Sequence, residues 1–429
     1  MVWLVILGGL AVLIVTGALL GPGIGLVGFI LLDRFAGGVT MLAVPAVWNV
    51  FTDFTLSAVP VFIFLGELLS RSGLSARLYT ALAPLFARVP GGLLQSNVWV
   101  CASFGAISGS SSATAAAVGS VAYPALSAQG YHRPSVLASL AGAGTLGLLI
   151  PPSLSLLIYG ATQDVSIGRL FLAGILPGLM MAVLFSVYVA VLSRRKGLVP
   201  TAATLPPWGE TLRRALGAWP LVLLVGAVLG TIYAGLATPT EAAALGVAIT
   251  VVLVLFSCDR PLKVIYEAFF HGVQVFGVLS LVIMGTLILA QAVGNLGLPR
   301  ALVGWVGQAG VDAAMVLLLV VLVYLVLGCF FDGLSLMIMT LPLVFPLLTG
   351  LGYDPVWLGV MITLMIEVAA ITPPIGVNLY VLLAVSNNEV RLPEAAVATI
   401  PYWLLLLFGA LLLTLFPQIA LFLPNLVFQ

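Results

Sequence analysis

Apolar runs of helix length follow one another along nearly the whole chain, and only short polar turns separate them. Two of these runs, 219–236 and 241–256, lead into a charged turn at 259–263. Hydrophobic residues make up 62% of the 429 positions and charged residues 7%, against about 45–50% and about 25% in soluble domains. A soluble fold cannot bury so much apolar surface, and one spanning helix needs about 20 apolar residues. We therefore predict a polytopic membrane protein, with room for roughly a dozen segments that cross or enter the bilayer.

The charge balance and the cysteines exclude several other classes of protein. The net charge is +1, which favours neither a nucleic-acid partner nor an acidic one. The cysteines are scattered in or beside apolar runs, and their spacing indicates neither a zinc site nor a disulfide framework: Cys101, Cys258 and Cys329. We expect no soluble domain, so substrate capture from water and any energy from a nucleotide must come from other chains.

Basic residues indicate which side of the membrane the polar turns face. The stretch 193–214 holds five of the fifteen basic residues: Arg194, Arg195, Lys196, Arg213 and Arg214. By the positive-inside rule this loop is predicted to be cytoplasmic, and two crossings return the chain to that side at 259–263. The polar strip 71–88 is predicted to be an amphipathic helix at the same interface. The run that starts at Met1 lacks a basic leader and is interrupted at 21–23, so we expect a first membrane segment, not a cleaved signal.

The two halves of the chain repeat one pattern. In the first half a Gly-Tyr turn at 130–131 precedes an apolar run that ends in a double proline at 151–152. In the second half a Gly-Tyr turn at 352–353 precedes a similar run that ends in a double proline at 373–374. Repeats with broken helices are typical of secondary transporters. We therefore predict an all-α membrane fold with two inverted, pseudo-symmetric repeats.

The double prolines are the part of this pattern that indicates a binding site. A proline inside a helix has no N–H for the carbonyl four residues back, and its ring pushes that carbonyl aside. The carbonyls left free in this way are those of Gly147, Leu148, Ala369 and Ala370. Free carbonyls at membrane depth are costly unless something binds them, and a small hard cation takes several such oxygens. The negative end of the half-helix and the hydroxyls of Ser153 and Thr372 favour the same ligand. The alternative is a plain proline kink whose carbonyls meet hydroxyls or water.

A turn rich in small residues precedes each broken helix. The first, 108–114, contains three consecutive serines, which suit a turn and a helix N-cap better than a helix interior. We predict a re-entrant hairpin whose free N–H groups can meet an anion, and a second hairpin at 328–335. Close helix packing through small residues is the alternative. A serine nucleophile is not indicated, because no Gly-x-Ser-x-Gly motif occurs and neither His132 nor His271 stands in a triad pattern.

Two acids, Asp332 and Glu367, are expected to lie at membrane depth. Such residues are functional by default, although either could be a capping or paired structural carboxylate. Neither break motif contains a basic residue. An acidic substrate would therefore be held by helix N-termini, hydroxyls and bound cations.

Three runs of residues resemble the large membrane subunit of tripartite ATP-independent periplasmic (TRAP) transporters. They are 106–114, 147–153 and 371–378, and the resemblance extends almost end to end. It implies sodium-driven uptake of an organic acid, usually a carboxylate, across a bacterial inner membrane by an elevator mechanism. It also implies two partners, a small membrane subunit and a periplasmic substrate-binding protein, with sodium as coupling ion and no cofactor.

The resemblance implies particular site residues as well. The first sodium site would use Ser108, Ser111, Gly147, Ile150 and Pro152. The second would use Gly328, Ala369, Thr372 and Ile375, with Ala369 where the family usually has glycine. The expected substrate contacts are Ser110, Ser153 or Ser155, and Asp332.

These predictions divide the chain into six parts. They are 1–89, scaffold helices with an interfacial arm; 90–193, the first transport repeat; 194–218, the cytoplasmic loop; 219–300, a second scaffold segment; 301–397, the second transport repeat; and 398–429, a C-terminal membrane helix. One alternative is a stand-alone sodium-coupled dicarboxylate carrier, and another, in a different class, is an ion channel. A repeat with hairpins suits alternating access better than a pore. No enzyme is predicted, because no convergent nucleophile and base are visible.

Overall fold

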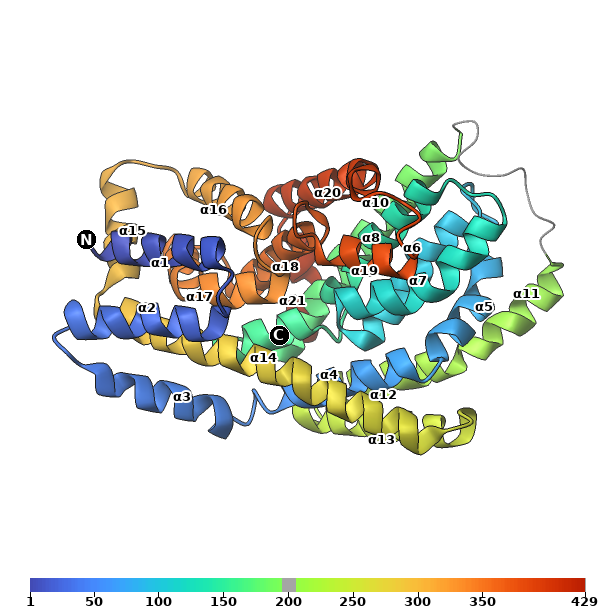
Figure 1. Cartoon of the computed structure of the whole chain (residues 1–429), viewed down its shortest axis with the longest axis horizontal. Coiled ribbons are helices and arrows are strands. Elements are labelled where there is room, and N and C mark those ends of the chain that lie inside the picture. Colours follow the sequence, from blue (N-terminus) through green and yellow to red (C-terminus); the bar gives the residue numbers. More distant parts are fainter. Residues whose placement is uncertain (195–205, 429) are drawn as a thin grey trace.

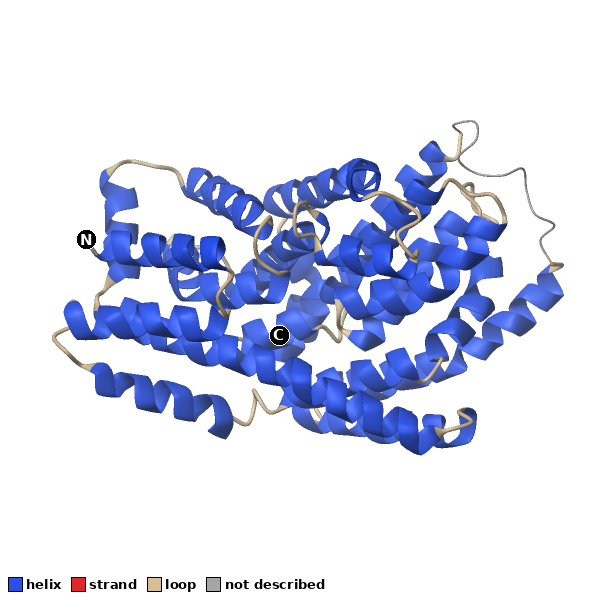
Figure 2. Ribbon diagram, viewed as in Figure 1, coloured by secondary structure: helices blue, strands red, loops and turns tan. Residues whose placement is uncertain are grey.

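The computed structural model describes residues 1–194 and 206–428, and every regular element in these ranges is a helix (Figure 1, Figure 2). The N-terminal elements are α1 Val2–Thr16, α2 Leu20–Arg34, the 3-10 turn η1 Thr40–Leu42, α3 Ala43–Thr52, α4 Ala58–Arg71 and α5 Leu74–Phe86. Then come α6 Leu93–Ser108, α7 Ser111–Ala128, α8 Arg133–Leu149, α9 Leu154–Thr162 and α10 Ile167–Leu192. The middle of the chain contains α11 Trp208–Ala215, the 3-10 turn η2 Leu216–Ala218, α12 Trp219–Tyr233, α13 Pro239–Ser257, α14 Pro261–Asn295 and α15 Leu298–Gln308. The last elements are α16 Ala313–Gly328, α17 Gly333–Gly350, α18 Pro355–Ile371, α19 Val377–Val385, α20 Leu392–Leu415 and α21 Gln418–Val427.

The helices are long and apolar enough for a multi-pass membrane protein. In the described residues seven helical segments can cross a membrane, or eight if α4 and α5, which meet at a bend of 68°, form one span. Five further apolar helices in this part of the chain are shorter, among them α1 with 15 residues and α16 with 16, and at 1.5 Å per residue these two cannot cross alone. Spans and shorter apolar helices together agree with the dozen segments expected to cross or enter the bilayer.

Two series of five helices have the same order and nearly the same lengths. Helices α6 to α10 contain 16, 18, 17, 9 and 26 residues. Helices α16 to α20 contain 16, 18, 17, 9 and 24 residues. In each series a double proline with a cis peptide bond separates the third helix from the fourth. The correspondence supports a duplication, while the inverted orientation of the repeats stays a prediction.

Glycines bring α2 into backbone contact with α14, the 35-residue helix that runs along one side of the molecule (Figure 1). A Cβ on Gly28 would lie 2.6 Å from the backbone nitrogen of Leu289, so only glycine allows this approach. The expected break at 21–23 is not there. Instead α1 ends at Thr16, its C-cap Gly17 has a φ of 62°, and 21–23 lie in the first turn of α2. A proline in that turn has no intrahelical N–H bond to lose.

The C-terminal part differs slightly from the expected single helix at 398–429. Helix α20 begins at Leu392, and α21 follows after a short turn at Phe416 and Pro417. The early start has a physical reason, because Pro393 stands at the first turn of α20, where a proline is well tolerated. Helix α20 packs against both α8 and α18, the two helices that end at the double prolines.

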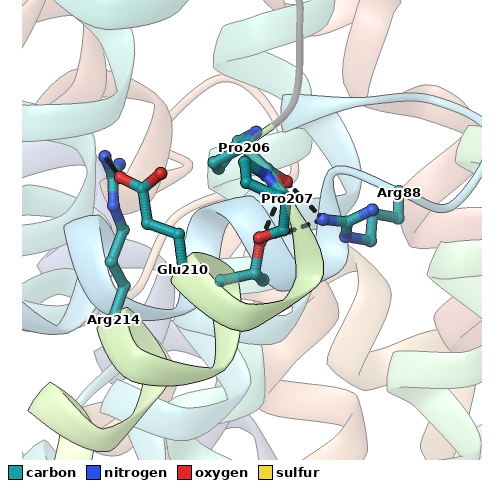
Figure 3. A network of polar contacts seen from close by, with 6 residues as sticks. Arg88, Pro206, Pro207, Glu210 and Arg214 are labelled. Atoms are coloured by element: carbon teal, nitrogen blue, oxygen red, sulfur yellow. Dashed lines mark hydrogen bonds and ion pairs between the residues drawn. The ribbon is translucent and has the colours of Figure 1, made fainter.

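Polar contacts fix the short helix α11 beside the end of α5 (Figure 3). The Arg88 guanidinium donates to the Pro206 carbonyl (2.6 Å) and to the Thr211 hydroxyl (3.0 Å), and it stacks 3.8 Å from the Trp208 ring. Along α11, Arg214 pairs with Glu210. The strip 71–88 and the basic loop therefore meet at one face, as expected if both are cytoplasmic. Arg195 and Lys196 of that loop lie outside the described residues.

We expect a cysteine at Gly209 to resist membrane-impermeant thiol reagents in intact cells, and one at Gln308 to react. Gly209 is exposed on α11, and no atom that the structure describes outside its own helix turn lies within 4 Å of a Cβ built there. Gln308 is exposed at the end of α15, three crossings away (α12, α13 and α14). The background carries alanine at the three native cysteines. The reverse labelling pattern would invert the predicted topology.

Candidate functional site

The first hairpin forms where α6 ends and α7 begins. Helix α6 ends at Ser108, and Gly109 takes the left-handed conformation (φ 61°) that L side chains rarely adopt. Ser110 is the N-cap of α7, and its side chain accepts the N–H of Ala113 (3.4 Å). The turn and N-cap expected from the consecutive serines are therefore present.

The tip of this hairpin is seated on the break between α8 and α9. The Leu154 N–H donates to the Gly109 carbonyl (3.2 Å), which ties the tip to the residues after the double proline. A Cβ on Gly109 would lie 2.9 Å from the Pro152 carbonyl oxygen, and one on Gly147 would lie 2.9 Å from the Ser110 carbonyl oxygen. The absence of side chains at both glycines brings the carbonyls of the tip and the break together.

Hydroxyl and carbonyl oxygens gather at this contact. The Ser108 and Thr114 hydroxyls are 2.7 Å apart, and the Thr114 hydroxyl donates to the Ser110 carbonyl (2.7 Å). Gly147 lies in the same contact, and its carbonyl has lost its backbone donor because Pro151 carries no N–H. Several uncharged oxygens within one small region are what a hard monovalent cation requires. Sequence reasoning did not single out Thr114, since its contact with Ser108 depends on the closure of the hairpin.

The Leu148 carbonyl, also predicted to be free, is satisfied by side chains. It accepts the Ser153 hydroxyl and the Ser155 hydroxyl (2.8 Å), and these two hydroxyls lie 2.8 Å apart. For the Leu148 carbonyl, the alternative interpretation is therefore correct: hydroxyl groups at a proline kink satisfy it, and no cation is needed there. Both serines are buried, so they support the break in this conformation and do not face an open cavity. Ile150, the C-cap of α8, still donates its N–H to the Leu146 carbonyl (2.9 Å).

The second hairpin packs on the second broken helix in a similar way. Asp332 is the N-cap of α17, and its carboxylate accepts the N–H of Ser335 (3.0 Å). A Cβ on Gly328, at the end of α16, would lie 2.6 Å from the Ala369 Cβ. One on Gly333 would lie 2.9 Å from the Ile366 carbonyl oxygen. The hairpin tip thus contacts the last turn of α18, with Gly328 and Ala369 in direct contact.

The second break itself begins at Thr372. The Thr372 hydroxyl donates to the Val368 carbonyl (2.6 Å), and its N–H lies 3.4 Å from the Ala369 carbonyl oxygen. The Ala369 carbonyl is therefore only weakly satisfied, and the Thr372 oxygen keeps its lone pairs. Gly376, with φ 30°, turns the chain into α19, and Ile375 before it is 38% exposed. Beside the prolines the second site thus offers one hydroxyl and backbone oxygens.

One side chain joins the two halves of the site. The Asn378 amide, just after the second break, donates to the Ser111 hydroxyl (2.6 Å) and to the Ala141 carbonyl (3.3 Å). Its carbonyl oxygen is buried and has no hydrogen-bond partner in the described structure. The start of α7 in the first repeat is thereby linked to α19 in the second. Asn378 belongs to the motif 371–378, but its partner could not be predicted without the fold.

Residues of each predicted sodium-site set lie at one hairpin–break contact, Gly147 at the first and Gly328 with Ala369 at the second. The comparisons identify the family of the chain. The family model for the tripartite ATP-independent periplasmic transporter, DctM component, matches residues 7–419. The chain belongs to this TRAP family. It is thus a transporter permease of the DctM type, a multi-pass protein of the bacterial inner membrane.

Named relatives in this family differ in what they carry. The chain is 34% identical over 374 residues to the C4-dicarboxylate TRAP transporter large permease DctM of Pseudomonas aeruginosa, covering 87% of this chain and 86% of that one. It is also 34% identical, over 380 residues, to the ectoine/5-hydroxyectoine TRAP large permease UehC of Ruegeria pomeroyi, covering 87% of each. The solved YdaH transporter of Alcanivorax borkumensis shares the fold, with a TM-score of 0.62, 16% identity and 90% of each chain covered.

Proposed function

We propose that this DctM-type permease couples the inward movement of sodium ions to the uptake of an organic acid. The observation that carries the proposal is the seating of each hairpin tip on a proline-broken helix. At the first contact the Ser108 and Thr114 hydroxyls and the Ser110 carbonyl, all hard and uncharged oxygens, gather beside Gly147, whose carbonyl lacks its backbone donor. Such a set suits Na⁺ better than a divalent or transition metal, which would attract more carboxylates or nitrogens.

The two ion sites follow the two contacts. We assign the first to Ser108, Ser111, Gly147, Ile150 and Pro152, and the second to Gly328, Ala369, Thr372 and Ile375. Bound cations next to the N-termini of α7 and α17 would make these ends attractive to an acidic substrate. We propose Ser110 and Asp332, the N-caps of these helices, as substrate contacts. Ser153 and Ser155 reach a substrate only if the first break opens.

The proposed partners and mechanism follow from the family. TRAP large permeases imply a small membrane subunit and a periplasmic substrate-binding protein. We propose that the binding protein delivers the acid to the hairpin tips, and that the two hairpin–break units move together against α2, α4 and α14 as an elevator. The glycine contacts between α2 and α14 suit a rigid scaffold, because close backbone packing resists sliding.

We expect uptake into liposomes that contain the complete complex to follow an inward sodium gradient. The binding protein and its ligand, found by thermal-shift screening with organic acids, are supplied outside. Sodium, proton and potassium gradients are then imposed in turn at fixed membrane potential. Omission of either partner should abolish uptake. Uptake driven equally well by a proton gradient without sodium would refute sodium coupling.

A further inference from the structure

Glu367 is the one acidic side chain among the described residues that is buried. It stands on α18, one turn before the second break, and has 0% of its surface exposed. Neither carboxylate oxygen has a hydrogen-bond partner, and none of the ion pairs of the described residues includes it. A buried carboxylate without a partner is strongly destabilising, and a membrane interior makes it more so. The two proposed sodium sites do not use this group.

The hydroxyl of Thr145, next to Glu367, directs its proton to another acceptor. The Thr145 side chain of α8 faces the Glu367 carboxylate. Its proton, however, goes to the Gly142 carbonyl one turn back, at 2.7 Å. The Thr145 oxygen therefore presents lone pairs to Glu367, and if Glu367 is ionised, acceptors from α8 and α18 meet with no donor between them. A bound cation then satisfies both sides at once, whereas a protonated Glu367 would itself donate to the Thr145 oxygen; sodium binding distinguishes the two states.

Further oxygens lie on the same face of α18. Thr363 precedes Glu367 by one helical turn, so the two side chains project from one side of the helix. The Thr363 hydroxyl donates to the Ser155 hydroxyl (3.4 Å), which itself donates to the Leu148 carbonyl (2.8 Å). The Thr363 proton is thus also directed away from Glu367. Thr145, Thr363 and Glu367 are all fully buried, so water outside the protein does not compensate them.

We propose that Glu367 is the centre of a third sodium site, in which its carboxylate and the Thr145 and Thr363 oxygens hold the ion. The inference rests on the proposed sodium coupling and extends it. One carboxylate with neutral oxygens suits a monovalent hard cation. The described residues contain no group of three or more His, Cys, Asp or Glu side chains that would favour a divalent or transition metal. A third ion would add one positive charge to every transport cycle.

The test is equilibrium binding of radioactive sodium to the purified permease at saturation. Glu367→Gln keeps the shape of the side chain and removes its charge, and we expect this variant to bind one sodium ion fewer than the wild-type chain. Thr145→Val should weaken the binding of one ion roughly tenfold, as loss of an oxygen that contacts a charge does. Thr250→Val is the matched control, because Thr250 is likewise buried and donates to the Gly246 carbonyl (2.8 Å) on α13.

Two other binding outcomes have separate meanings. An unchanged number of ions in Glu367→Gln would overturn the third site and leave the two proposed sodium sites standing. No specific sodium binding in the wild-type chain would instead refute the proposed function itself.

Thermal unfolding in choline and in sodium provides the second measurement. A ligand that binds only the folded state stabilises it as its concentration rises above Kd. We expect Glu367→Gln to be at least as stable as the wild-type chain in choline, and to gain less from sodium. Equal behaviour of the two chains in both salts would mean that Glu367 carries its own proton and holds no ion. If Glu367→Gln does not accumulate, Thr145→Val compared with Thr250→Val decides, and equal sodium affinities in that pair would overturn the proposal.

Discussion

Gly328→Ala is expected to remove most transport, and Ala369→Gly in the same chain is expected to restore much of it. The new Cβ would stand 2.6 Å from the Ala369 Cβ, a distance that neither group can relieve by rotation. Overpacking of this kind costs about 1–3 kcal/mol, so the population with the second hairpin packed on the break would fall roughly five- to 150-fold. Removal of the Ala369 Cβ leaves the Cα at 3.1 Å, which a small shift can accommodate. The measurement is the uptake rate of the wild-type chain, of Gly328→Ala and of the double variant.

Gly277→Ala is the matched control for this pair. Gly277 lies on an exposed face of α14 with no atom within 4 Å of a built Cβ, and alanine favours a helix. Its transport should remain near that of the wild-type chain. If Gly328→Ala transported normally, or if Ala369→Gly failed to improve the double variant while both proteins remained folded, the direct Gly328–Ala369 contact would not govern the second site.

Ser111→Ala and Thr372→Ala are each expected to lower the apparent sodium affinity roughly ten- to a hundredfold. Each removes one oxygen next to a break while changing little volume, and a lost contact to a charge is worth about 1.5–3 kcal/mol. Ser111→Ala also leaves the Asn378 amide without its 2.6 Å acceptor, so its effect should be the larger of the two. The measurement is uptake against sodium concentration.

Thr372→Ser serves as the control for the second site, since it keeps the oxygen that donates to the Val368 carbonyl. The apparent sodium affinity of Thr372→Ser should fall much less than that of Thr372→Ala. Thermal stability in detergent without sodium separates ion binding from folding. Wild-type sodium dependence in both alanine variants, with intact protein, would mean that these hydroxyls only pack the breaks.

The positions of the breaks could be predicted from local chemistry. A double proline cannot continue a helix, and α8 and α18 end at Leu149 and Ile371, directly before the breaks. The N-cap at Ser110 follows from the same kind of reasoning, because the hydroxyl competes for backbone N–H groups nearby. Asp332 caps α17, a role that its sequence context allowed, and its contact with substrate stays a proposal.

Contacts between distant segments could not be predicted in this way. Nothing near Ser111 in the sequence indicates that Asn378 donates to it. The hydroxyls of Ser153 and Ser155 reach the Leu148 carbonyl only because the chain turns sharply after Pro152. The close approach of α2 to α14 likewise depends on glycines in both helices, which a local pattern does not pair. Single-sequence reasoning thus found the donors and acceptors but not their partners.

Substrate-dependent entry of radioactive sodium into the same liposomes tests the central claim most directly. The vesicles contain the complete complex, the liganded binding protein is added outside, and sodium and substrate are counted together. We expect sodium to enter only when substrate enters, at a constant ratio, and Ser111→Ala to reduce both fluxes at limiting sodium. Substrate uptake without accompanying sodium entry would contradict the account.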